Sequence, residues 1–366
     1  MVLAKKVRQK VVKLNFKGTL ITAGIDIHLK QWNVSVFVED RHYKTFQQEP
    51  CPQKLYEYLE KHFPEGTYQS SYEAGYFGYH PHRELESLGI NNMVINAGDV
   101  PTSDKDKRRK SDKVDAKKIA VAQVNKMTKS IYIPSEQMEA DRKVLRFRTK
   151  TLRKEVTANK QRLKAFLVRL GVHKEIEGYG NSYWSKKIIE QIKQLDLAQA
   201  NDRYMLDELI AKYTYLKAKL SRTNRHIVIM SRQDRYAELV ERLRSIPGIG
   251  LLTAMCIITE IWDMKRFASL DKLSSFVGIV PDTSSSASRE QVKGLTKRAN
   301  VELRRLLIQS SWVASSRCRY MAKIYQDHKK KREQKGIIKV ARKILSVIRA
   351  VWLKNENYSI DKMYIV

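Results

Sequence analysis

The sequence LITAGIDIHLKQWNVSVFV at positions 20–38 predicts two neighbouring β-strands. Its first eight residues form a short, mostly apolar run, as expected of a central strand, and this run contains one carboxylate, Asp26. Residues 32–38 then alternate apolar and polar side chains, which is the period-two pattern of a half-buried strand. Lys30 and Gln31 lie between the two runs and predict a hairpin turn.

The residues that follow alternate between helix and strand patterns. Leu55, Tyr58 and Leu59 have helical spacing, and Pro64 and Gly66 end that helix. Three early strands followed by alternating helix and strand indicate an α/β domain with a mixed sheet. The further expected strands are 42–47, 68–73 and 92–96, and the further expected helices are 81–88 and 111–126.

Composition indicates a globular protein with a polyanionic partner. The 366 residues include 70 Lys and Arg against 39 Asp and Glu, which gives a formal net charge of +31. A hydrophobic fraction of 42% can build a core, and no apolar run reaches the roughly 18 residues of a membrane span. Because the positive charge is spread along the whole chain, a nucleic-acid partner is favoured over a membrane surface.

The first residues and the cysteines predict a cytoplasmic protein. Residues 1–18 form a basic tail whose apolar positions are interrupted by Lys and Arg, so we expect no secretory segment. Cys51, Cys256 and Cys318 lie far apart, with neither a metal-ligand spacing nor a disulfide framework.

Residues 135–236 contain two long patterns with apolar side chains at heptad spacing. Two long helices in an antiparallel or intermolecular coiled coil explain this spacing. A plain helical bundle within one chain explains it equally well, because heptads do not identify the partner helix. The apolar positions are Leu145, Leu152, Val156, Leu163, Phe166 and Leu170 in the first pattern, and Leu206, Leu209, Tyr213, Leu216, Leu220, Ile227 and Met230 in the second.

Four carboxylates of the first domain form a candidate metal site. Asp26 lies in an apolar strand, where a buried carboxylate is costly unless it is paired or bound to metal, and Glu73 ends another strand. Asp112 and Asp115 are three residues apart, so a helix places both on one face. Converging oxygen ligands suit Mg²⁺, and two such ions can activate an attacking oxygen and stabilise a leaving one. Structural explanations stay open: Asp26 can pair with Lys30, Glu73 can be a turn residue, and Asp112 can cap the helix.

Two basic runs are candidate nucleic-acid contacts. Eight Lys and Arg lie between positions 105 and 118, around the last carboxylate pair. Positions 317–349 hold twelve Lys and Arg against two acids. A solvated helix face is the alternative for such a run, but the net charge favours phosphate contacts. The candidate contacts are Arg108, Arg109 and Lys110 in the first run and Lys330, Lys331 and Arg332 in the second.

In the last third we expect helices near 251–261 and 301–315, together with a glycine hairpin and a serine-rich loop. Residues 245–250 resemble a helix-hairpin-helix, in which Gly248 and Gly250 would let backbone N–H groups approach a phosphate; a structural tight turn explains them equally well. The serine-rich loop at 283–288 precedes cations that could hold an attacked phosphate, and a serine nucleophile needs such activation. From composition alone, a flexible polar loop is the favoured alternative. The cations are Arg289, Lys293 and Lys297.

Together these segments resemble the transposases of insertion-sequence family one-hundred-and-ten, the DEDD recombinases. The resemblance covers nearly the whole chain. It implies an N-terminal RuvC-like domain with the RNase H fold, a coiled-coil middle and a mainly helical C-terminal domain that carries an essential serine. The matching segments are AGIDIHLKQWNVSVF, YEAGYFG, VINAGD, SDKVDAKKIA, SIPGIGLLTA, FVGIVP and GLTKRANVELRRLL.

The resemblance also implies the site residues. The family's serine lies a few residues past a Gly-x-x-Pro, which is 278–281 in this chain, and falls on Ser286. Ala287 and Ala299 stand where the family usually has glycine. The family's serine can therefore correspond to any of the serines within 284–288. The DEDD carboxylates, which are the expected Mg²⁺ ligands, fall on Asp26, Glu73, Asp112 and Asp115.

The expected partners follow from the same resemblance. Family members use a noncoding RNA from the element's own end to choose target and donor DNA. Their carboxylates and serine act in a composite site between subunits of a tetramer, through a covalent phosphoserine-type intermediate. We therefore expect a nucleoid-associated bacterial protein that forms dimers and, in the active complex, tetramers, with no membrane partner.

The leading hypothesis is an RNA-guided DNA transposase. The alternative is a Holliday-junction resolvase-like endonuclease that uses only the four carboxylates and Mg²⁺. A third class is a non-catalytic nucleic-acid-binding protein, in which the carboxylates are structural. The expected segments are a basic tail at 1–18, a RuvC-like DEDD domain at 19–128, a helical coiled-coil region at 129–237 and a C-terminal transposase domain at 238–366.

Overall fold

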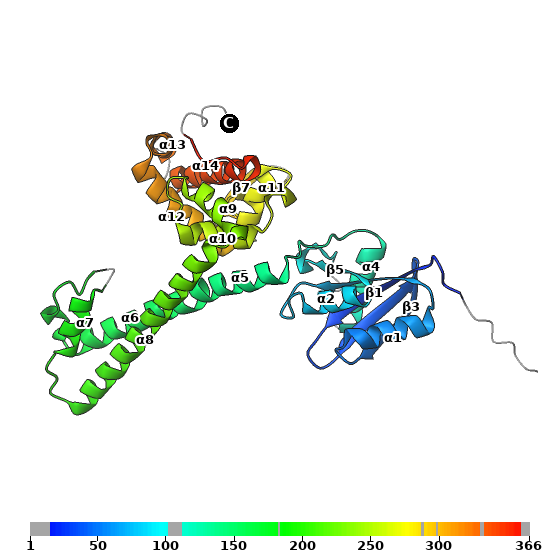
Figure 1. Cartoon of the computed structure of the whole chain (residues 1–366), viewed down its shortest axis with the longest axis horizontal. Helices are drawn as coiled ribbons and strands as arrows, with labels where there is room; N and C mark the ends of the chain where they lie inside the picture. Colours follow the sequence, from blue (N-terminus) through cyan, green and yellow to red (C-terminus); the bar gives the residue numbers. More distant parts are fainter. Residues whose placement is uncertain are drawn as a thin grey trace, which may run out of the picture. The chain divides into compact units, whose positions relative to one another are not determined.

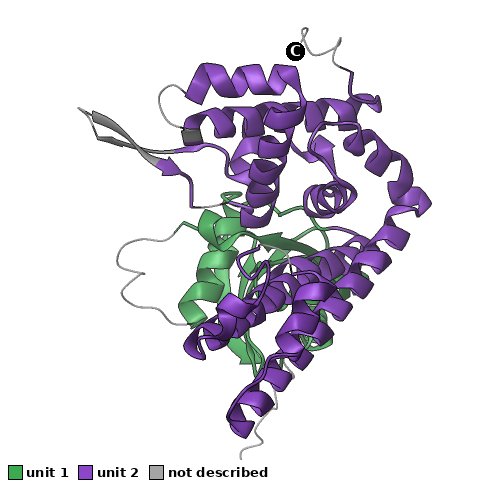
Figure 2. Cartoon of the chain, turned by 90° about the vertical axis from the view of Figure 1, so that its left-hand side faces the viewer, with its two compact units in different colours: residues 1–133 green, residues 134–366 purple. Residues whose placement is uncertain are grey.

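The chain folds as two compact units, residues 1–133 and residues 134–366, which Figure 2 shows in two colours. The computed structural model describes residues 15–101, 112–181, 184–286, 289–297, 299–329 and 333–359. The predicted domain boundary after residue 237, which lies within unit 2, stays a prediction.

Unit 1 is built on a five-stranded mixed sheet with the strand order β3-β2-β1-β4-β5 (Figure 1). The first three strands pair antiparallel, as the hairpin pattern predicts, and β4 and β5 add parallel to β1 on its other side. The mixed α/β sheet expected from the sequence is therefore confirmed. The strands are β1 (Leu20–Ile27), β2 (Trp32–Val38), β3 (Arg41–Gln48), β4 (Thr67–Glu73) and β5 (Asn91–Ile95).

The two faces of this sheet have different characters. On one face, Ile21 and Ile25 of β1 pack with α1 (Pro52–His62) and α2 (His80–Ser87) in an apolar core. The other face carries Gly24 and is covered by α4 (Asp112–Val124). A Cβ atom on Gly24 would lie 2.3 Å from the backbone oxygen of Ala116, so only glycine lets α4 lie this close to β1. A 3₁₀ turn, η1 (Ala97–Asp99), follows β5.

The first half of unit 2 is an antiparallel pair of long helices (Figure 1). In one, α5 (Glu136–Arg146), the π-helical turn η2 (Phe147–Leu152) and α6 (Arg153–Arg169) follow one another without a break, and the other is α8 (Ala200–Ser231). Arg148 donates to Asn224 Oδ1 at 2.6 Å and Asn159 donates to the Leu209 carbonyl at 2.9 Å. The residue numbers of the contacts increase along the first helix and decrease along α8, so the two helices run in opposite directions.

The two long helices expected from the heptads are thus confirmed, and they pack on each other within one chain. At their far end, Trp184 is fully buried in an apolar cluster with residues of α6, α7 (Lys186–Lys193) and α8. The 3₁₀ turn η3 (Val172–Glu175) connects into this cluster. An additional intermolecular coiled coil stays a prediction.

The remaining helices of unit 2 share one apolar core with α10 (Leu251–Ile261), whose residues from Ala254 to Ile261 are all buried. The expected helices near 251–261 and 301–315 are confirmed. Across the described segments, no helix is both long and apolar enough to span a membrane. The helices are α9 (Asp234–Arg244), α10 (Leu251–Ile261), η4 (Met264–Arg266), α11 (Leu270–Val277), α12 (Val301–Arg317), α13 (Arg319–Lys329) and α14 (Glu333–Lys354).

The serine-rich segment differs from its prediction as a loop. Most of it lies in a strand, β6 (Pro281–Ser286), which pairs antiparallel with β7 (Arg289–Leu295). The prediction was wrong because serines give no apolar alternation, whereas the backbone pairing that forms a two-stranded hairpin does not depend on apolar side chains.

Candidate metal and nucleic-acid site

The carboxylates of β1 and α4 converge on the sheet face that α4 covers. Asp26 lies two residues after Gly24, and alternate strand residues share a face, so Asp26 points toward the first turn of α4. His28 Nε2 lies 3.0 Å from Asp26 Oδ2 and 3.8 Å from Asp112 Oδ2. One ligand atom from each of these three residues lies within 4.8 Å of the others. Within the described segments, the three could therefore share one ion.

Burial raises the pKa of the Asp26 carboxyl above its usual value. The charge and hydrogen bond of His28 act in the opposite direction, and the negative charges of Asp112 and Asp115 add to the increase. A carboxyl group that is half desolvated beside other carboxylates is in an unfavourable electrostatic position when no cation is bound. The site therefore favours binding of positive charge.

The other two predicted carboxylates lie at the edge of this cluster. Asp115 accepts from Lys118 Nζ at 3.1 Å in the first turns of α4. Glu73 is the exposed last residue of β4. In the parallel register Ile25 pairs with Tyr72, so Asp26 and Glu73 come next on neighbouring strands. The sheet thus brings Glu73 to the same end as Asp26, although Glu73 is not part of the three-residue cluster.

The donor atoms present fit a divalent cation. Carboxylate oxygens are the preferred ligands of Mg²⁺, and an imidazole nitrogen is an accepted ligand of several first-row metals. Asp26 and Asp112 would hold the ion, while Asp115 follows in the first turn of α4 and Glu73 lies at the same end of the sheet. Sequence reasoning did not include His28, although its place two residues beyond Asp26 on an extended strand puts it on the same face.

A hollow opens beside the cluster, between the loop after β1 and the loop after β4. Its wall includes the highly exposed side chains of Leu29 and Tyr76, which are 72% and 89% exposed. Exposed rings at such a position can stack on nucleobases. The lining residues are His28, Leu29, Lys30, Gln31, Tyr76 and Phe77.

The glycine turn between α9 and α10 packs against α12 of the same unit. Gly248 has φ +87°, and a Cβ atom there would lie 2.3 Å from the Ser310 carbonyl oxygen of α12. This close approach accounts for Gly248 without any phosphate. Gly250 precedes the first turn of α10 and has open space where a Cβ atom would project, so a phosphate contact at Gly250 stays a prediction.

The backbone pairing of β6 with β7 places Ser286, the last residue of β6, opposite Arg289, the first residue of β7. The side chains between 282 and 293 are outside what the structure describes, including those of Arg289 and Lys293. Lys297 is exposed after β7. The other expected nucleic-acid contacts lie outside the described residues: Arg108, Arg109, Lys110, Lys330, Lys331 and Arg332.

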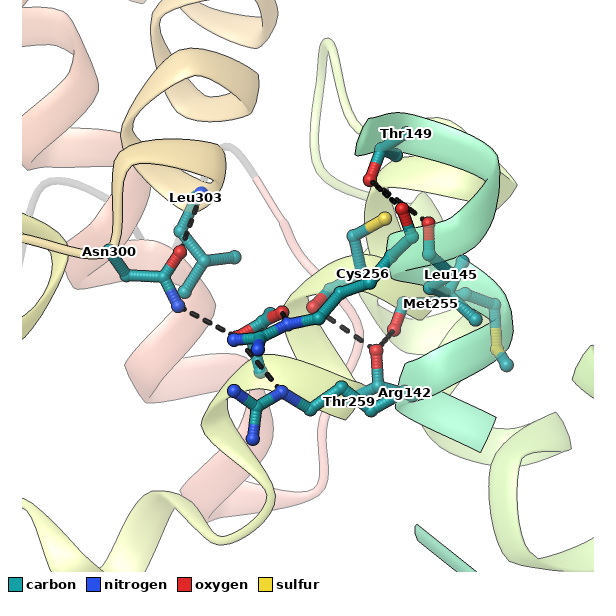
Figure 3. Close-up of polar contacts among 10 residues, drawn as sticks. Arg142, Leu145, Thr149, Met255, Cys256, Thr259, Asn300 and Leu303 are labelled. Atoms are coloured by element: carbon teal, nitrogen blue, oxygen red, sulfur yellow. Dashed lines mark hydrogen bonds and ion pairs between the residues drawn. The ribbon is translucent and has the colours of Figure 1, made fainter. Parts of the chain in front are cut away.

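Ion pairs and hydrogen bonds surround a buried carboxylate of α10 (Figure 3). Glu260 on α10 accepts two hydrogen bonds from Arg146, at 2.7 and 2.9 Å, and lies 3.3 Å from Arg142 Nε. Asn300 donates to Glu260 at 2.8 Å and also caps α12 by accepting from the Leu303 amide. These contacts therefore join α5, α10 and the start of α12, which follows the hairpin directly.

A mixed sheet with a converging carboxylate site, followed by a long helical region, defines an α/β protein with a candidate acidic metal site. Comparison with known families narrows this class. A family model described as "Transposase IS116/IS110/IS902 family" matches residues 240–326, and an IS110-type DEDD transposase model matches residues 23–171. The chain belongs to this family of transposases.

Individual relatives agree with the family models. The chain is 30% identical over 251 residues to the transposase for insertion sequence element IS1533 of Leptospira borgpetersenii, covering 66% of this chain and 69% of the relative. It is 26% identical over 242 residues to the putative transposase y4qE of Sinorhizobium fredii, covering 66% of this chain and 57% of the relative. The match to the transposase for IS1328 of Yersinia enterocolitica is 27% identical over 222 residues, covering 59% of this chain and 62% of the relative. The chain thus spans less than two thirds of the last two relatives' length.

Proposed function

We propose that this chain is a DNA transposase that cuts and exchanges DNA strands at the ends of an insertion sequence. The observation that carries the proposal is the convergence of Asp26 and Asp112 in a chain of a transposase family. In this proposal unit 1 is a RuvC-like domain with the RNase H fold, and its order of a mixed sheet followed by α4 supports that assignment.

Asp26, Glu73, Asp112 and Asp115 are proposed to hold Mg²⁺ at the end of β1 and β4. The bound cation would polarise the phosphodiester and stabilise the oxygen that leaves. The protein's own contribution is to position the carboxylates: Gly24 lets α4 approach β1, and this approach brings Asp112 to Asp26. The hollow beside His28 offers the adjoining DNA an exposed aromatic ring at Tyr76.

Ser286 is proposed as the nucleophile. Its Oγ–P bond would replace one P–O bond of the DNA backbone, while the displaced sugar oxygen takes a proton and leaves as a hydroxyl. The serine proton passes to a base in the same site. Exchange rather than hydrolysis follows, because the broken end stays attached by a bond of similar energy. Ser286 is the register partner of Arg289, a residue type that binds phosphate, and this pairing supports the proposal.

Partners of this transposase are proposed to be target and donor DNA and a noncoding guide RNA. The net charge of +31 supports polyanionic partners. The carboxylates and Ser286 would meet in a composite site within a dimer or tetramer. Light scattering at high protein concentration tests the oligomer, and a monomer under all conditions would contradict it.

The proposal is tested by trapping a covalent protein–DNA adduct on labelled element ends with the guide RNA and Mg²⁺ present. The wild-type chain should form the adduct, and Asp26→Asn should not. Asp40→Asn is the matched control, because Asp40 is an exposed carboxylate in the turn after β2. Ser286→Ala should eliminate the adduct, whereas Ser285→Ala should retain it.

Each other outcome identifies what is wrong. Metal-dependent cleavage without an adduct supports the resolvase-like endonuclease. If the phenotypes of Ser285→Ala and Ser286→Ala are exchanged, the serine register is off by one residue. DNA binding with no metal-dependent reaction in any variant supports a non-catalytic binding protein, and the four carboxylates are then structural.

A further inference from the structure

The carboxylate cluster of unit 1 contains an imidazole that the DEDD assignment leaves out. His28 Nε2 lies 3.0 Å from Asp26 Oδ2 and 3.8 Å from Asp112 Oδ2. The side chain of His28 is 49% exposed, so apolar packing does not hold its ring over the carboxylates. Two carboxylates and one imidazole nitrogen around a common point are a donor set for a transition-metal ion.

A second observation, at Asn33, indicates that this site is built to receive a ligand. Asn33 on β2 is the register partner of Asp26 and is fully buried, and directly opposed residues of an antiparallel pair have their side chains on the same face. Neither amide atom of Asn33 has a hydrogen-bond partner among the described residues. An unsatisfied buried polar group costs about 1–3 kcal/mol. Such a group beside Asp26 fits a site whose hydrogen bonds are completed only when an ion and its accompanying polar groups enter.

We propose that His28 is a direct ligand of the divalent ion, together with Asp26 and Asp112, and that it makes the site prefer Mn²⁺ to Mg²⁺. This inference rests on the metal centre of the proposed function and adds the imidazole and its consequence. Mg²⁺ binds oxygen ligands and keeps its waters, whereas transition-metal ions accept an imidazole nitrogen readily. A site with His28 as ligand therefore gains more affinity for Mn²⁺ than for Mg²⁺.

The inference is tested by metal binding to the intact protein, without any turnover. Mn²⁺ and Mg²⁺ affinities are measured by calorimetric titration, and electron spin-echo spectroscopy of bound Mn²⁺ detects a coordinated histidine nitrogen. His28→Gln should weaken Mn²⁺ binding by roughly tenfold or more, change Mg²⁺ binding much less, and remove the nitrogen signal. His80→Gln is the matched control, since His80 is an exposed histidine of the same unit paired with Glu84.

Asp26→Asn separates failure of this inference from failure of the proposed function. If Asp26→Asn loses both ions while His28→Gln keeps wild-type Mn²⁺ affinity and its nitrogen signal, the metal centre stands and the role of His28 is wrong. If Asp26→Asn binds both ions as the wild type does, the metal centre itself is misplaced, and this inference fails with it. Absence of Mn²⁺ binding by the wild-type protein, even with duplex DNA present, also overturns the inference.

Discussion

At Glu260 a single side chain combines deep burial with a full charge. Burial by itself would raise its pKa, but the hydrogen bond from Arg146, the charges of Arg142 and Arg146 and the Asn300 amide hold the pKa below its ordinary value of 4.5. A carboxylate with a lowered folded-state pKa stabilises the fold above its unfolded-state pKa, and this contribution is lost as the pH falls through the folded-state value.

We therefore expect Glu260→Gln to reduce the free energy of unfolding by roughly 3 kcal/mol near neutral pH, because it removes the buried carboxylate that pairs with the partly buried Arg142 and Arg146. The difference from wild type should shrink as the pH falls below the ordinary carboxyl pKa. Denaturant unfolding followed by circular dichroism at neutral and acidic pH measures both effects. Glu238→Gln is the control, since its pair with Arg242 is exposed and contributes little. An equal loss in both variants would contradict the role of burial.

The exposed ring of Tyr76 can be tested for a role in DNA binding. Its ring is 89% exposed in the hollow beside His28. If the ring stacks on a nucleobase, Tyr76→Ala should weaken binding of single-stranded or unpaired DNA by about 1–3 kcal/mol. Fluorescence anisotropy with a labelled strand measures this, and Tyr204→Ala, which removes another exposed ring in unit 2, should leave the affinity unchanged. Equal affinities for Tyr76→Ala and the wild type would rule out stacking.

Individual residues differ in how well the sequence predicts their positions. Asp26 was recognisable because a carboxylate in an apolar strand requires compensation, and the structure places it beside Asp112. His28 and Asn33 gave no such signal, since a polar residue near a strand end is ordinary. Asn33 reaches Asp26 only through the pairing of β1 with β2, which brings residues seven apart in sequence onto one sheet face.

The heptad pattern predicted that the two long helices exist. It did not predict how deeply each heptad position is buried. Leu216 is 5% exposed, whereas Leu220, one turn further along α8, is only partly buried. The heptad pattern predicted an equal role for both. Because the two helices cross each other, contact varies along their length, and no periodicity in one helix encodes where the partner diverges.

We expect Leu216→Ala to destabilise unit 2 by roughly 2–5 kcal/mol and Leu220→Ala to destabilise it clearly less. The physical reason is that only the buried side chain leaves a cavity when it is shortened. Thermal unfolding of the two variants beside wild type measures the difference. A larger loss for Leu220→Ala would mean that α8 packs through a different face, for example against a second copy of the chain.

The β6–β7 hairpin, in contrast, is an element that the sequence pattern did not predict. Polar strands such as β6 carry no apolar alternation, so their sequence predicts a loop. The strands β1, β2 and β5 were predictable because each contains buried apolar side chains.

For the whole molecule, the dominant physical property is charge. Positions 317–349 contain twelve Lys and Arg residues and only two acidic residues. Binding of nucleic acid should therefore release many counterions. Each phosphate contact adds about 0.9 to the magnitude of the log–log salt slope on duplex DNA. We expect a slope of several units in anisotropy titrations over a range of salt concentrations. Affinity that is flat between low and physiological salt would contradict extensive phosphate contact.

A DNA strand-exchange assay in cells tests the catalytic role of the carboxylate site, with the wild-type chain, Asp26→Asn and the control Asp40→Asn expressed beside the element's own ends. Nucleic-acid binding is measured in parallel with the purified proteins. The carboxylate site predicts that Asp26→Asn abolishes strand exchange while binding stays nearly intact, because one of many charges changes, and that Asp40→Asn exchanges strands as the wild type does. Wild-type strand exchange by Asp26→Asn would contradict the account.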